Sequence, residues 1–542
     1  MSKSNLLCKR KLHLIFHRTS SSVQVPLPVP VIKVPKYVEQ HVERAKRKEF
    51  FKELNAKNRR KIAYRGDTSI PVISSTIGDY NFYLGQIYND RYTLPVQSKY
   101  WFKLKSAGQR FKINPHGSNP SLALTDPNEY VDDVYFPNEF SKMNLNQSIV
   151  TSLSNDFNFI KPTRIQTLVI PRILMERHVL IASEAGGGKT ISYLAPVIHQ
   201  LSSLKETTEP LPDSPLGLIV VPGRELAEQV GEVAFKLGKS CNVETRVLIS
   251  DGTKLRHLTL YPNTKIDLIV ASIGCLNKLF SKGKIMLGNV RHIVLDEADT
   301  LLDSSFIDET TYLLQKLMIK TSDFSRFGAQ LIVSSSIYPS GIDTIFNNEF
   351  RKQDIIKVCS PYLHRIPPHV EQRFWRVTHD AKGGELLDLV KLDHQKKKSV
   401  MIFCNKSPTC DWLSLFLEEN NIPNAKFHGG MGPNERANIF RGFQDGSVNV
   451  LVCTDLASRG LDTQRVHHVI NFDFPNNVSD YLLRIGRVGR VGTNHGRVTN
   501  LINSKSGVFT VKDIETAVRR AGRIPNVDSD IKLKIKKLYF TP

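Results

Sequence analysis

The chain has 542 residues, of which 40% are hydrophobic and 23% charged, and its formal net charge at pH 7 is +22. This composition predicts a globular protein of about two to four domains, and it excludes membrane-spanning helices, because no apolar run approaches ~18 residues. The excess of Lys and Arg predicts a polyanionic partner, most simply nucleic acid, although solubility and a targeting signal would account for part of it.

The first 38 residues are basic and contain no Asp or Glu. Lysines and arginines alternate there with leucines and isoleucines, and a run of hydroxyl residues follows at 19–22. A basic, Ser-containing, amphipathic segment is typical of a mitochondrial transit peptide. We therefore predict that residues 1–38 direct the protein to the mitochondrial matrix. If they are instead a basic disordered arm, the expected location is the nucleus or the cytoplasm.

Residues 39–135 are predicted to form a basic N-terminal extension. Residues 37–62 are dense in Lys, Arg and Glu with a sparse apolar stripe, which fits either a basic helix that contacts RNA or a solvated helix. Further on, Tyr100, Trp101 and Phe102 lie close to several lysines and arginines. These rings could stack on RNA bases or, as is commoner for such aromatics, pack against the next domain.

Short apolar runs alternate with helical periodicity in two sets, and each set predicts a doubly wound parallel sheet in an α/β fold. The first set falls within residues 136–360, with apolar runs at 179–182, 217–221, 246–250, 267–271, 292–295 and 330–333. The second set falls within residues 361–525, with runs at 400–404, 424–428, 448–453, 467–472 and 496–502. A basic C-terminal tail, residues 526–542, completes the predicted organisation.

A glycine-rich stretch follows the first apolar run and leads into a helical pattern. It consists of Ser183, Glu184, Ala185, Gly186, Gly187, Gly188, Lys189 and Thr190. Strand, glycine loop and helix is the context of a phosphate-binding loop, in which backbone N–H groups and the helix N-terminus favour an anion. Lys189 would reach the β- and γ-phosphates of a nucleotide, and the Thr190 hydroxyl would ligate Mg²⁺. The second half lacks such a loop, so we expect the nucleotide to bind in a cleft between the halves.

An acidic turn, Asp296-Glu297-Ala298-Asp299, follows the apolar run at 292–295. Carboxylates at the C-terminal end of a strand in such a sheet are placed for metal binding and water activation. We expect Asp296 to hold Mg²⁺ through water, and Glu297 to orient or deprotonate the attacking water.

Several further motifs occur in a fixed order along both halves. They are Pro162-Thr163-Arg164-Ile165-Gln166 with Phe140 upstream, Pro222-Gly223-Arg224-Glu225-Leu226-Ala227, His428-Gly429-Gly430-Met431 with Arg436, Thr454-Asp455-Leu456-Ala457-Ser458-Arg459-Gly460-Leu461-Asp462, and Tyr481-Leu482-Leu483-Arg484-Ile485-Gly486-Arg487-Val488-Gly489-Arg490. With the phosphate-binding loop and the acidic turn, this series resembles the DEAD-box ATP-dependent RNA helicases over about residues 136–525. The resemblance extends to the mitochondrial members linked to assembly of the large mitoribosomal subunit.

The resemblance implies two tandem RecA-like domains that hydrolyse ATP to ADP and phosphate, with ATP and Mg²⁺ as cofactors. RNA is the implied partner, and ribosomal RNA and ribosome-assembly proteins are the specific expectation. A non-unwinding, ATP-gated RNA-binding clamp or assembly scaffold is the alternative. A DNA helicase is a remoter one, because the adenine-reading motif and the Asp-Glu-Ala-Asp sequence favour RNA.

By the same resemblance, Gln166 would read the edge of adenine and Phe140 would stack on it. Asp462 would contact the ribose or the domain interface. Arg487 and Arg490 would act as arginine fingers across the cleft.

The resemblance also assigns RNA contacts, made mainly to phosphates and 2′-hydroxyls. The candidate residues are Pro222, Arg224, Gly252, Ser272, Gly274, Arg436, Thr454 and Arg459.

Some positions depart from the family pattern. The family's Ser-Ala-Thr maps onto Ser335-Ser336-Ile337, or in a less favoured register onto residues 334–336, and the usual His of the last motif is Leu483. We hypothesise that Ile337 and Leu483 replace a polar coupling network with an apolar contact near Asp299. Cys275 stands where the family has an RNA-contacting arginine, so RNA contacts are expected to be weaker there.

Overall fold

The computed structural model describes residues 63–64, 71–87, 94–102, 106–122, 137–207, 211–249, 265–303, 305–320, 328–338, 355–458, 463, 465–490, 496–525 and 527. The chain divides into two compact units, Met1–Ile62 and Ala63–Pro542, and all of the described residues belong to the second. The predictions for residues 1–38 and 37–62 therefore lie outside the described residues, as does the tail at 526–542 apart from Val527.

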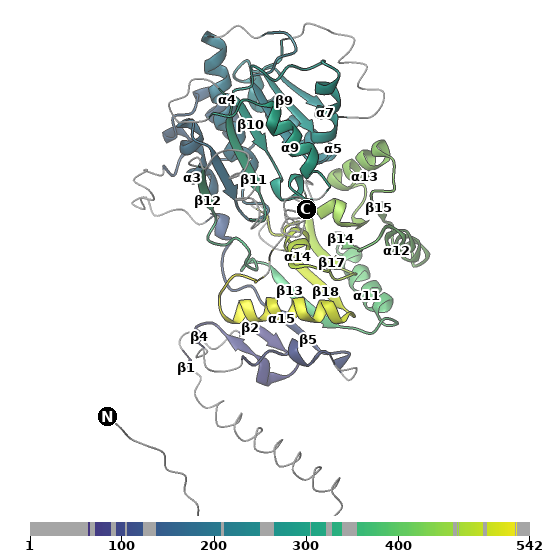
Figure 1. The fold of residues 1–542 in the computed structure, drawn as a ribbon. Coiled ribbons are helices and arrows are strands. Elements are labelled where there is room, and N and C mark those ends of the chain that lie inside the picture. The colour runs from purple at the N-terminus through teal and green to yellow at the C-terminus, as the bar shows by residue number, and fades with distance from the viewer. Residues whose placement is uncertain are drawn as a thin grey trace, which may run out of the picture. The chain divides into compact units, whose positions relative to one another are not determined.

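The first α/β half is built on a parallel sheet. Seven strands of the described chain form it in the order β12-β6-β11-β10-β7-β9-β8 (Figure 1). Their bounds are β6 (Val179–Ala182), β7 (Gly217–Val221), β8 (Thr245–Leu248), β9 (Leu268–Ser272), β10 (His292–Leu295), β11 (Gln330–Ser335) and β12 (Ile356–Cys359). Every pairing is parallel, so the predicted doubly wound sheet is confirmed, with β12 as a strand that the apolar pattern did not indicate.

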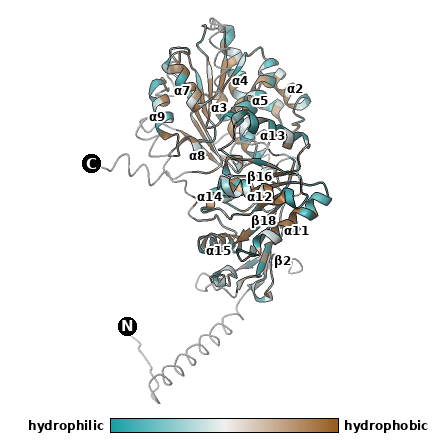
Figure 2. Cartoon of the chain, turned by 90° about the vertical axis from the view of Figure 1, so that its right-hand side faces the viewer, coloured by the Kyte–Doolittle hydropathy of each residue, from teal (hydrophilic) through white to brown (hydrophobic). Residues whose placement is uncertain are grey.

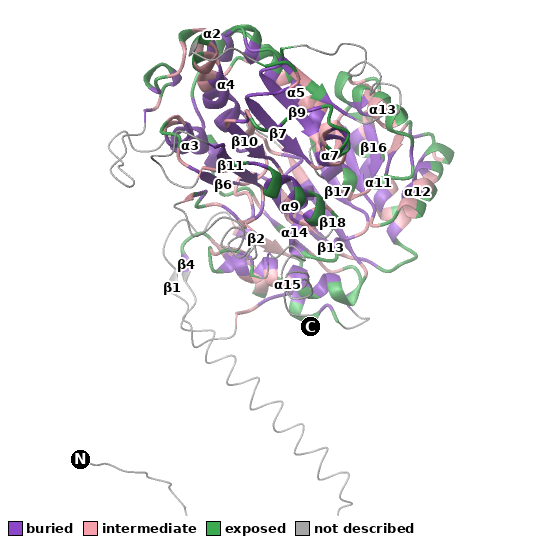
Figure 3. Ribbon diagram, turned by 45° about the horizontal axis from the view of Figure 1, so that its top comes forward, coloured by how far each residue is buried: buried purple, intermediate pink, exposed green. Residues whose placement is uncertain are grey.

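Helices cover both faces of this sheet. One face carries α2 (Gln147–Asn155), α3 (Arg164–Leu174), α4 (Lys189–Thr207) and α5 (Arg224–Lys239), and the other carries α7 (Ile273–Ser281), α8 (Ala298–Leu301) and α9 (Ile307–Lys316). Successive strand residues point to opposite faces, so Ile181 packs in one hydrophobic cluster and Leu180 in the other. This two-sided burial explains why the strands are continuously apolar, and Figure 3 shows them as buried.

The second half is built on a mixed sheet. Within the described residues it has nine strands in the order β15-β16-β14-β17-β18-β13-β5-β2-β3. Their bounds are β2 (Pro71–Ser75), β3 (Phe82–Tyr83), β5 (Arg110–Ile113), β13 (Glu371–Arg376), β14 (Ser399–Phe403), β15 (Ala425–Phe427), β16 (Val450–Cys453), β17 (Val466–Asn471) and β18 (Arg497–Ile502). Its helices are α11 (Lys382–Gln395), α12 (Ser407–Glu419), α13 (Pro433–Asp445), α14 (Val478–Ile485) and α15 (Lys505–Arg519). The pairs from β15 to β18 are parallel, as the sequence predicted. The apolar pattern did not indicate β13, which pairs parallel with β18.

Part of the N-terminal extension belongs to this second sheet. β5 pairs antiparallel with β13 and β2, and β2 pairs antiparallel with β3 (Figure 1). The Phe111 ring stacks on Phe374 at 4.7 Å between centroids, and Trp101 is completely buried in the same cluster. Trp101 therefore packs against the second half and is not available to stack on RNA. Tyr100 and Phe102 are 48% and 37% exposed.

A buried carboxylate fastens the extension to the last helix. Glu515 on α15 accepts hydrogen bonds from the backbone N–H groups of Gln97 and Ser98, both at 3.0 Å, and from the Ser98 hydroxyl at 2.7 Å. Arg519, one turn further along α15, donates to Glu515 and to the carbonyl of Tyr80. Both charges are buried and paired, so removing either one would leave the other uncompensated.

Hydrophobic residues concentrate in the sheets, while the outer faces of the helices are hydrophilic (Figure 2). None of the helices in the described part of the chain is long and apolar enough to span a membrane.

Trp101 provides a test of whether the extension stabilises the second half. We expect Trp101→Ala to lower the free energy of unfolding of the full chain by about 3–5 kcal/mol, because a fully buried large side chain is lost. Chemical denaturation followed by circular dichroism measures this. The neighbouring Phe102→Ala is the control and should cost less than about 1 kcal/mol. Equal losses for the two variants would contradict the packing described.

Candidate functional site

The glycine-rich loop joins β6 to α4 as predicted. Gly186 and Gly188 have φ angles of +82° and +90°, in the left-handed region that favours glycine. A Cβ on Gly188 would lie 2.7 Å from Gln166 Nε2, so this position has no room for a side chain. Lys189 begins α4, and its Nζ donates to the carbonyl oxygens of Ser183 and Glu184 at 2.8 and 3.0 Å.

The charge of Lys189 is buried among acidic groups. Burial lowers the pKa of its ammonium, and four neighbouring carboxylates oppose that shift. These are Asp296, Glu184, Asp299 and Glu297. A buried cation at a helix N-terminus, held only by two backbone carbonyls and these carboxylates, suits a phosphate ligand.

The acidic turn lies beside this lysine. Tyr193, one helical turn after Lys189, donates its hydroxyl to Asp296 Oδ2 at 2.7 Å, and the Glu297 N–H donates to Asp296 Oδ1 at 2.9 Å. Burial, and then the Asp296 carboxylate, raise the pKa of Tyr193 well above its usual range, so the hydroxyl stays a donor. The sequence analysis missed Tyr193. The available signal was its i+4 spacing from Lys189 on the same face of the helix.

The residues present fit a Mg²⁺ ion that is held jointly by protein and nucleotide. The described residues contain no cluster of three or more His, Cys, Asp or Glu side chains that could hold a metal. Mg²⁺ at nucleotide sites typically keeps several waters and uses one or two carboxylates together with phosphates. Thr190 and the oriented Asp296 carboxylate would be the protein ligands of the ion, and the phosphates and waters would supply the others.

Glu297 has a strained backbone. Its φ and ψ are both 50°, in the left-handed region, where it precedes the first residue of α8. Such conformations cluster at functional sites. Asp299, two residues on, accepts the backbone N–H of Ile337 at 3.2 Å and so ties the acidic turn to the end of β11.

The adenine-reading motif is tied to the phosphate-binding loop. Gln166 Oε1 accepts the N–H of Thr163 at 2.8 Å in a capping box at the start of α3, and Gln166 Nε2 donates to the carbonyl of Gly188 at 3.1 Å. Both ends of the Gln166 amide are thus bonded to backbone. Phe140 is 4% exposed, and its ring belongs to the hydrophobic core cluster of the first half rather than facing solvent.

The second half touches the loop through the turn that follows α14. A Cβ on Gly186 would lie 2.9 Å from Arg490 Cγ, and a Cβ on Gly486 would lie 2.4 Å from the Cβ of Ala185. Arg490 Nε donates to the carbonyl of Gly486 at 3.2 Å, and Arg487, 4% exposed, donates to Leu483 at 3.3 Å. Residues about 300 positions apart are therefore brought to the same place, as expected.

Arg484 in the same motif organises the second half from within. It is completely buried and makes two hydrogen bonds to the Asp455 carboxylate, at 2.6 and 2.9 Å. It also donates to Asn405, Asn471 and the carbonyl of Asp473. Its spacing of three residues from buried Tyr481 was the signal that it faces inward.

Most RNA-contact candidates follow the carboxyl ends of strands. Pro222 follows β7, Ser272 ends β9 and Thr454 follows β16, and each is half-buried. Arg224 begins α5 and Gly274 is the second residue of α7 at that edge of the first half, and Arg436 lies on α13 of the second. Gly252, Arg459 and Asp462 lie outside the described residues.

An ion pair connects the two halves near these candidates. Arg436 Nε donates to Glu225 Oε1 at 2.8 Å, so α13 of the second half meets α5 of the first. Arg224, the residue before Glu225, donates to Glu228 at 3.2 Å. Two predicted RNA-contact arginines thus lie on either side of the junction.

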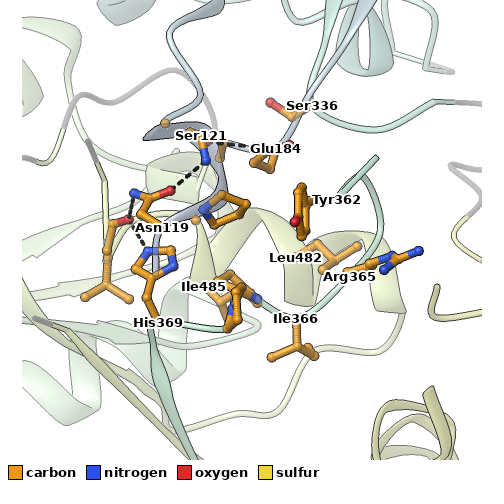
Figure 4. Close-up of a pocket in the computed structure, with 18 of the residues that line it drawn as sticks. Asn119, Ser121, Glu184, Ser336, Tyr362, Arg365, Ile366, His369, Leu482 and Ile485 are labelled. Carbon is orange, nitrogen blue, oxygen red and sulfur yellow. Dashed lines mark hydrogen bonds between the residues drawn. The ribbon is translucent and has the colours of Figure 1, made fainter. Parts of the chain in front are cut away.

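A small cavity of about 50 Å³ lies between the catalytic motifs. Its lining includes Ala185 and Gly186, Ile337, the segment around Tyr362, and Leu483 (Figure 4). The phosphate-binding loop, the end of β11 and α14 therefore border one space, as expected of a nucleotide site shared by the two halves.

Comparisons with known proteins agree with this geometry. The DEAD/DEAH box helicase model matches residues 163–339, and the helicase conserved C-terminal domain model matches residues 381–492. The probable ATP-dependent RNA helicase DDX28 of Mus musculus is 38% identical over 384 residues, which are 69% of this chain and 71% of that protein. The chain belongs to the DEAD-box ATP-dependent RNA helicase family.

Other relatives and solved structures agree. DEAD-box ATP-dependent RNA helicase 39 of Arabidopsis thaliana is 30% identical over 402 residues, covering 72% of this chain and 63% of that protein. The structure of S. cerevisiae Dbp5 bound to RNA and ADP BeF3 matches with a TM-score of 0.59 at 21% identity, over 74% of this chain and 98% of that one. Mss116p bound to ssRNA and AMP-PNP matches with a TM-score of 0.62 at 21% identity, over 77% and 84%. These structural likenesses confirm the fold of two RecA-like domains.

Membership of the DEAD-box family accounts for the phosphate-binding loop and the acidic turn. It also gives a reason to examine the positions that differ from the family pattern. As a member of this family the chain is an ATP hydrolase of the RNA helicase type. Ile337 and Leu483 are 2% and 6% exposed and belong to one hydrophobic cluster, although they come from different halves of the helicase. The hydrogen bond from Ile337 to Asp299 favours the first of the two registers. Cys275 is buried in the first half, with its thiol pKa raised by burial.

The apolar contact between the halves can be exchanged for a polar one. We expect Ile337→Thr with Leu483→His to change the number of duplexes separated per ATP hydrolysed by about two- to thirtyfold, the range of typical coupling energies between sites. ATP affinity should change little, because neither side chain belongs to the phosphate-binding loop. Parallel ATPase and unwinding assays measure the ratio.

The control for this pair is Ile366→Thr, which removes apolar volume from the same cluster without replacing the residue that bonds to Asp299. If the double variant alters neither turnover nor unwinding, or only matches Ile366→Thr, the coupling hypothesis fails.

Proposed function

We propose that this helicase is an RNA-stimulated ATPase that remodels RNA or RNA–protein complexes during ribosome assembly in the mitochondrial matrix. The observation that carries the ATPase part is the contact between the phosphate-binding loop and the turn holding Arg487 and Arg490. In this contact Arg490, one of the two candidate fingers, lies beside the loop that contains Lys189. A site divided between two domains works only when the domains meet, so any ligand that favours their meeting stimulates turnover.

The chain's residues would divide the chemistry among themselves. Lys189 and the loop N–H groups would hold the nucleotide phosphates, and Thr190 with Asp296 would hold Mg²⁺, whose charge would offset that of the phosphates. Glu297 would orient the attacking water or accept its proton. Arg487 and Arg490 would stabilise the charge on the transferring phosphoryl group.

RNA would bind at the edge of both sheets where the strands end. The candidates on the two halves meet at the Arg436–Glu225 ion pair, so one strand of RNA could contact both halves only in a particular relative position. Contacts to phosphates and 2′-hydroxyls give little sequence specificity. If RNA and ATP both favour the closed position, each must tighten the binding of the other.

Ribosomal RNA and ribosome-assembly proteins are the partners we propose. The net charge of +22 suits a large polyanion, and the acid-free basic N-terminus supports import into mitochondria. The nucleus or the cytoplasm remains the alternative location.

A second candidate function is an ATP-gated RNA clamp that does not unwind. The burial of Ile337 and Leu483 in one hydrophobic cluster favours it. Apolar packing lacks the directional hydrogen bonds that could couple hydrolysis in one half to movement of the other. ATP hydrolysis would then time RNA release rather than drive strand separation.

Turnover with and without RNA tests the enzymatic proposal. We expect wild-type protein to show RNA-stimulated ATPase activity and Glu297→Gln to lower kcat by about 10²–10⁴-fold, the usual contribution of a general base. Lys189→Ala should abolish turnover and weaken ATP binding. Lys236→Ala and Glu232→Gln are matched controls, because this exposed pair lies on the outside of α5, and both should keep wild-type activity. RNA binding without turnover in every variant would favour the clamp.

Import can be tested separately. We expect a fluorescent fusion of the full chain to enter mitochondria and the same fusion lacking residues 1–38 to remain in the cytoplasm or nucleus. A matched deletion of the basic tail, residues 526–542, should leave the location unchanged. Mitochondrial import of the shortened chain would contradict the transit-peptide prediction.

A further inference from the structure

A segment of the N-terminal extension reaches the nucleotide site. After β5, the backbone N–H of His116 donates to the carbonyl of Pro368 at 2.9 Å, and the chain then forms the short 3-10 helix η4 (Pro120–Leu122). Pro120 and Ser121 are buried although they belong to a short connecting turn of the N-terminal extension. Segments of this kind are normally exposed, so something on the protein surface covers them.

The phosphate-binding loop is what covers them. The Ser121 hydroxyl donates to Glu184 Oε1 at 2.8 Å, and a Cβ on Gly187 would lie 3.7 Å from Ser121 Oγ (Figure 4). Asn119 Oδ1 accepts the N–H of Ser121 at 3.0 Å and shapes the turn. We call residues 119–121 the strap.

The strap also contacts the second half. Asn119 Nδ2 donates to the carbonyl of Gly489 at 3.4 Å, and His369 Nε2 donates to the same carbonyl at 2.7 Å (Figure 4). Gly489 directly precedes Arg490, the candidate finger. The strap therefore joins the loop that would hold phosphates to the turn that would complete the site.

The space beside the strap is too small for a nucleotide base and its ribose. Pro120 and Ser121 line a pocket of only about 10 Å³. The rest of its lining is Arg164, Ile165, Leu168, Ser183, Glu184, Gly187, Ser360 and Pro361. Arg164 and Ile165 belong to the adenine-reading motif, and Ser183, Glu184 and Gly187 to the phosphate-binding loop. These are the two elements that a nucleotide must bridge. Pockets that bind small molecules typically measure about 300–1,000 Å³. Moving the strap is the direct way to enlarge this one.

We propose that residues 119–121 are an intramolecular competitor of ATP that covers the base end of the nucleotide site and must leave when ATP binds. This proposal rests on the nucleotide site proposed above and adds a regulatory segment to it. Because the strap continues from β5 of the second sheet, its release also removes a link between the two halves. Binding of a nucleotide would then release the strap, and release of the strap would allow the two halves to move relative to each other.

Removing the Ser121 hydroxyl tests the competition. In the absence of RNA, Ser121→Ala in the full chain should bind ATP about fivefold more tightly than wild type, the effect of a net hydrogen bond lost only from the strapped state. Ser106→Ala is the matched control, because Ser106 is also buried in the extension but donates to Trp101. It should bind ATP like wild type. Equal or weaker binding by Ser121→Ala would overturn the proposal.

Hydrogen exchange provides an independent measurement on the wild-type chain. Adding a non-hydrolysable ATP analogue without RNA should speed amide exchange at residues 119–122 while slowing it in the phosphate-binding loop. Slower or unchanged exchange at residues 119–122 would overturn the strap alone and make it a fixed wall of the site. Failure of wild-type protein to bind the analogue would overturn the strap and the proposed ATPase together.

Discussion

The close approach of two backbones is the constraint on which the site depends. The phosphate-binding loop and the turn after α14 meet where Gly186, Gly486 and Ala185 leave almost no room for larger side chains. The candidate phosphate ligands lie on one side of this contact and the candidate arginine fingers on the other. A phosphoryl group placed between them must change the contact itself, so occupancy of the site and the relative position of the halves are physically inseparable.

Buried charges give the second half the rigidity that this arrangement needs. Arg484 binds Asp455 and three further acceptors inside the domain, and Glu515 binds the N-terminal extension from the opposite end of the sheet. Each charged group is compensated by several hydrogen bonds, so it fixes geometry more than it adds net stability. The extension is consequently a structural part of the second half, although it precedes the first half in sequence.

This chain order gives the helicase two covalent connections between its halves. One is the linker after β12, and the other is the segment from β5 through the strap to the first half. Ile337 of the first half and Leu483 of the second are buried in one hydrophobic cluster at the same junction. The phosphate-binding loop is therefore combined with these further links between the halves, and regulation of the ATPase cycle is where we expect this helicase to differ from its relatives.

Sequence alone determined the parallel sheet of the first half, most of the parallel part of the second sheet, the phosphate-binding loop and the acidic turn at Asp296. These depend on local patterns: continuous apolar runs, glycines at fixed spacing and carboxylates at a strand end. The sequence did not determine whether Trp101 stacks on RNA or packs against a domain. It also did not predict that Ser121 contacts Glu184. Those contacts join residues tens to hundreds of positions apart in sequence. The last of the parallel strands, β13, carries no local mark of which segment will pair with its other side. Only the tertiary structure decided that the extension completes the second sheet and that its last turn lies against the nucleotide site.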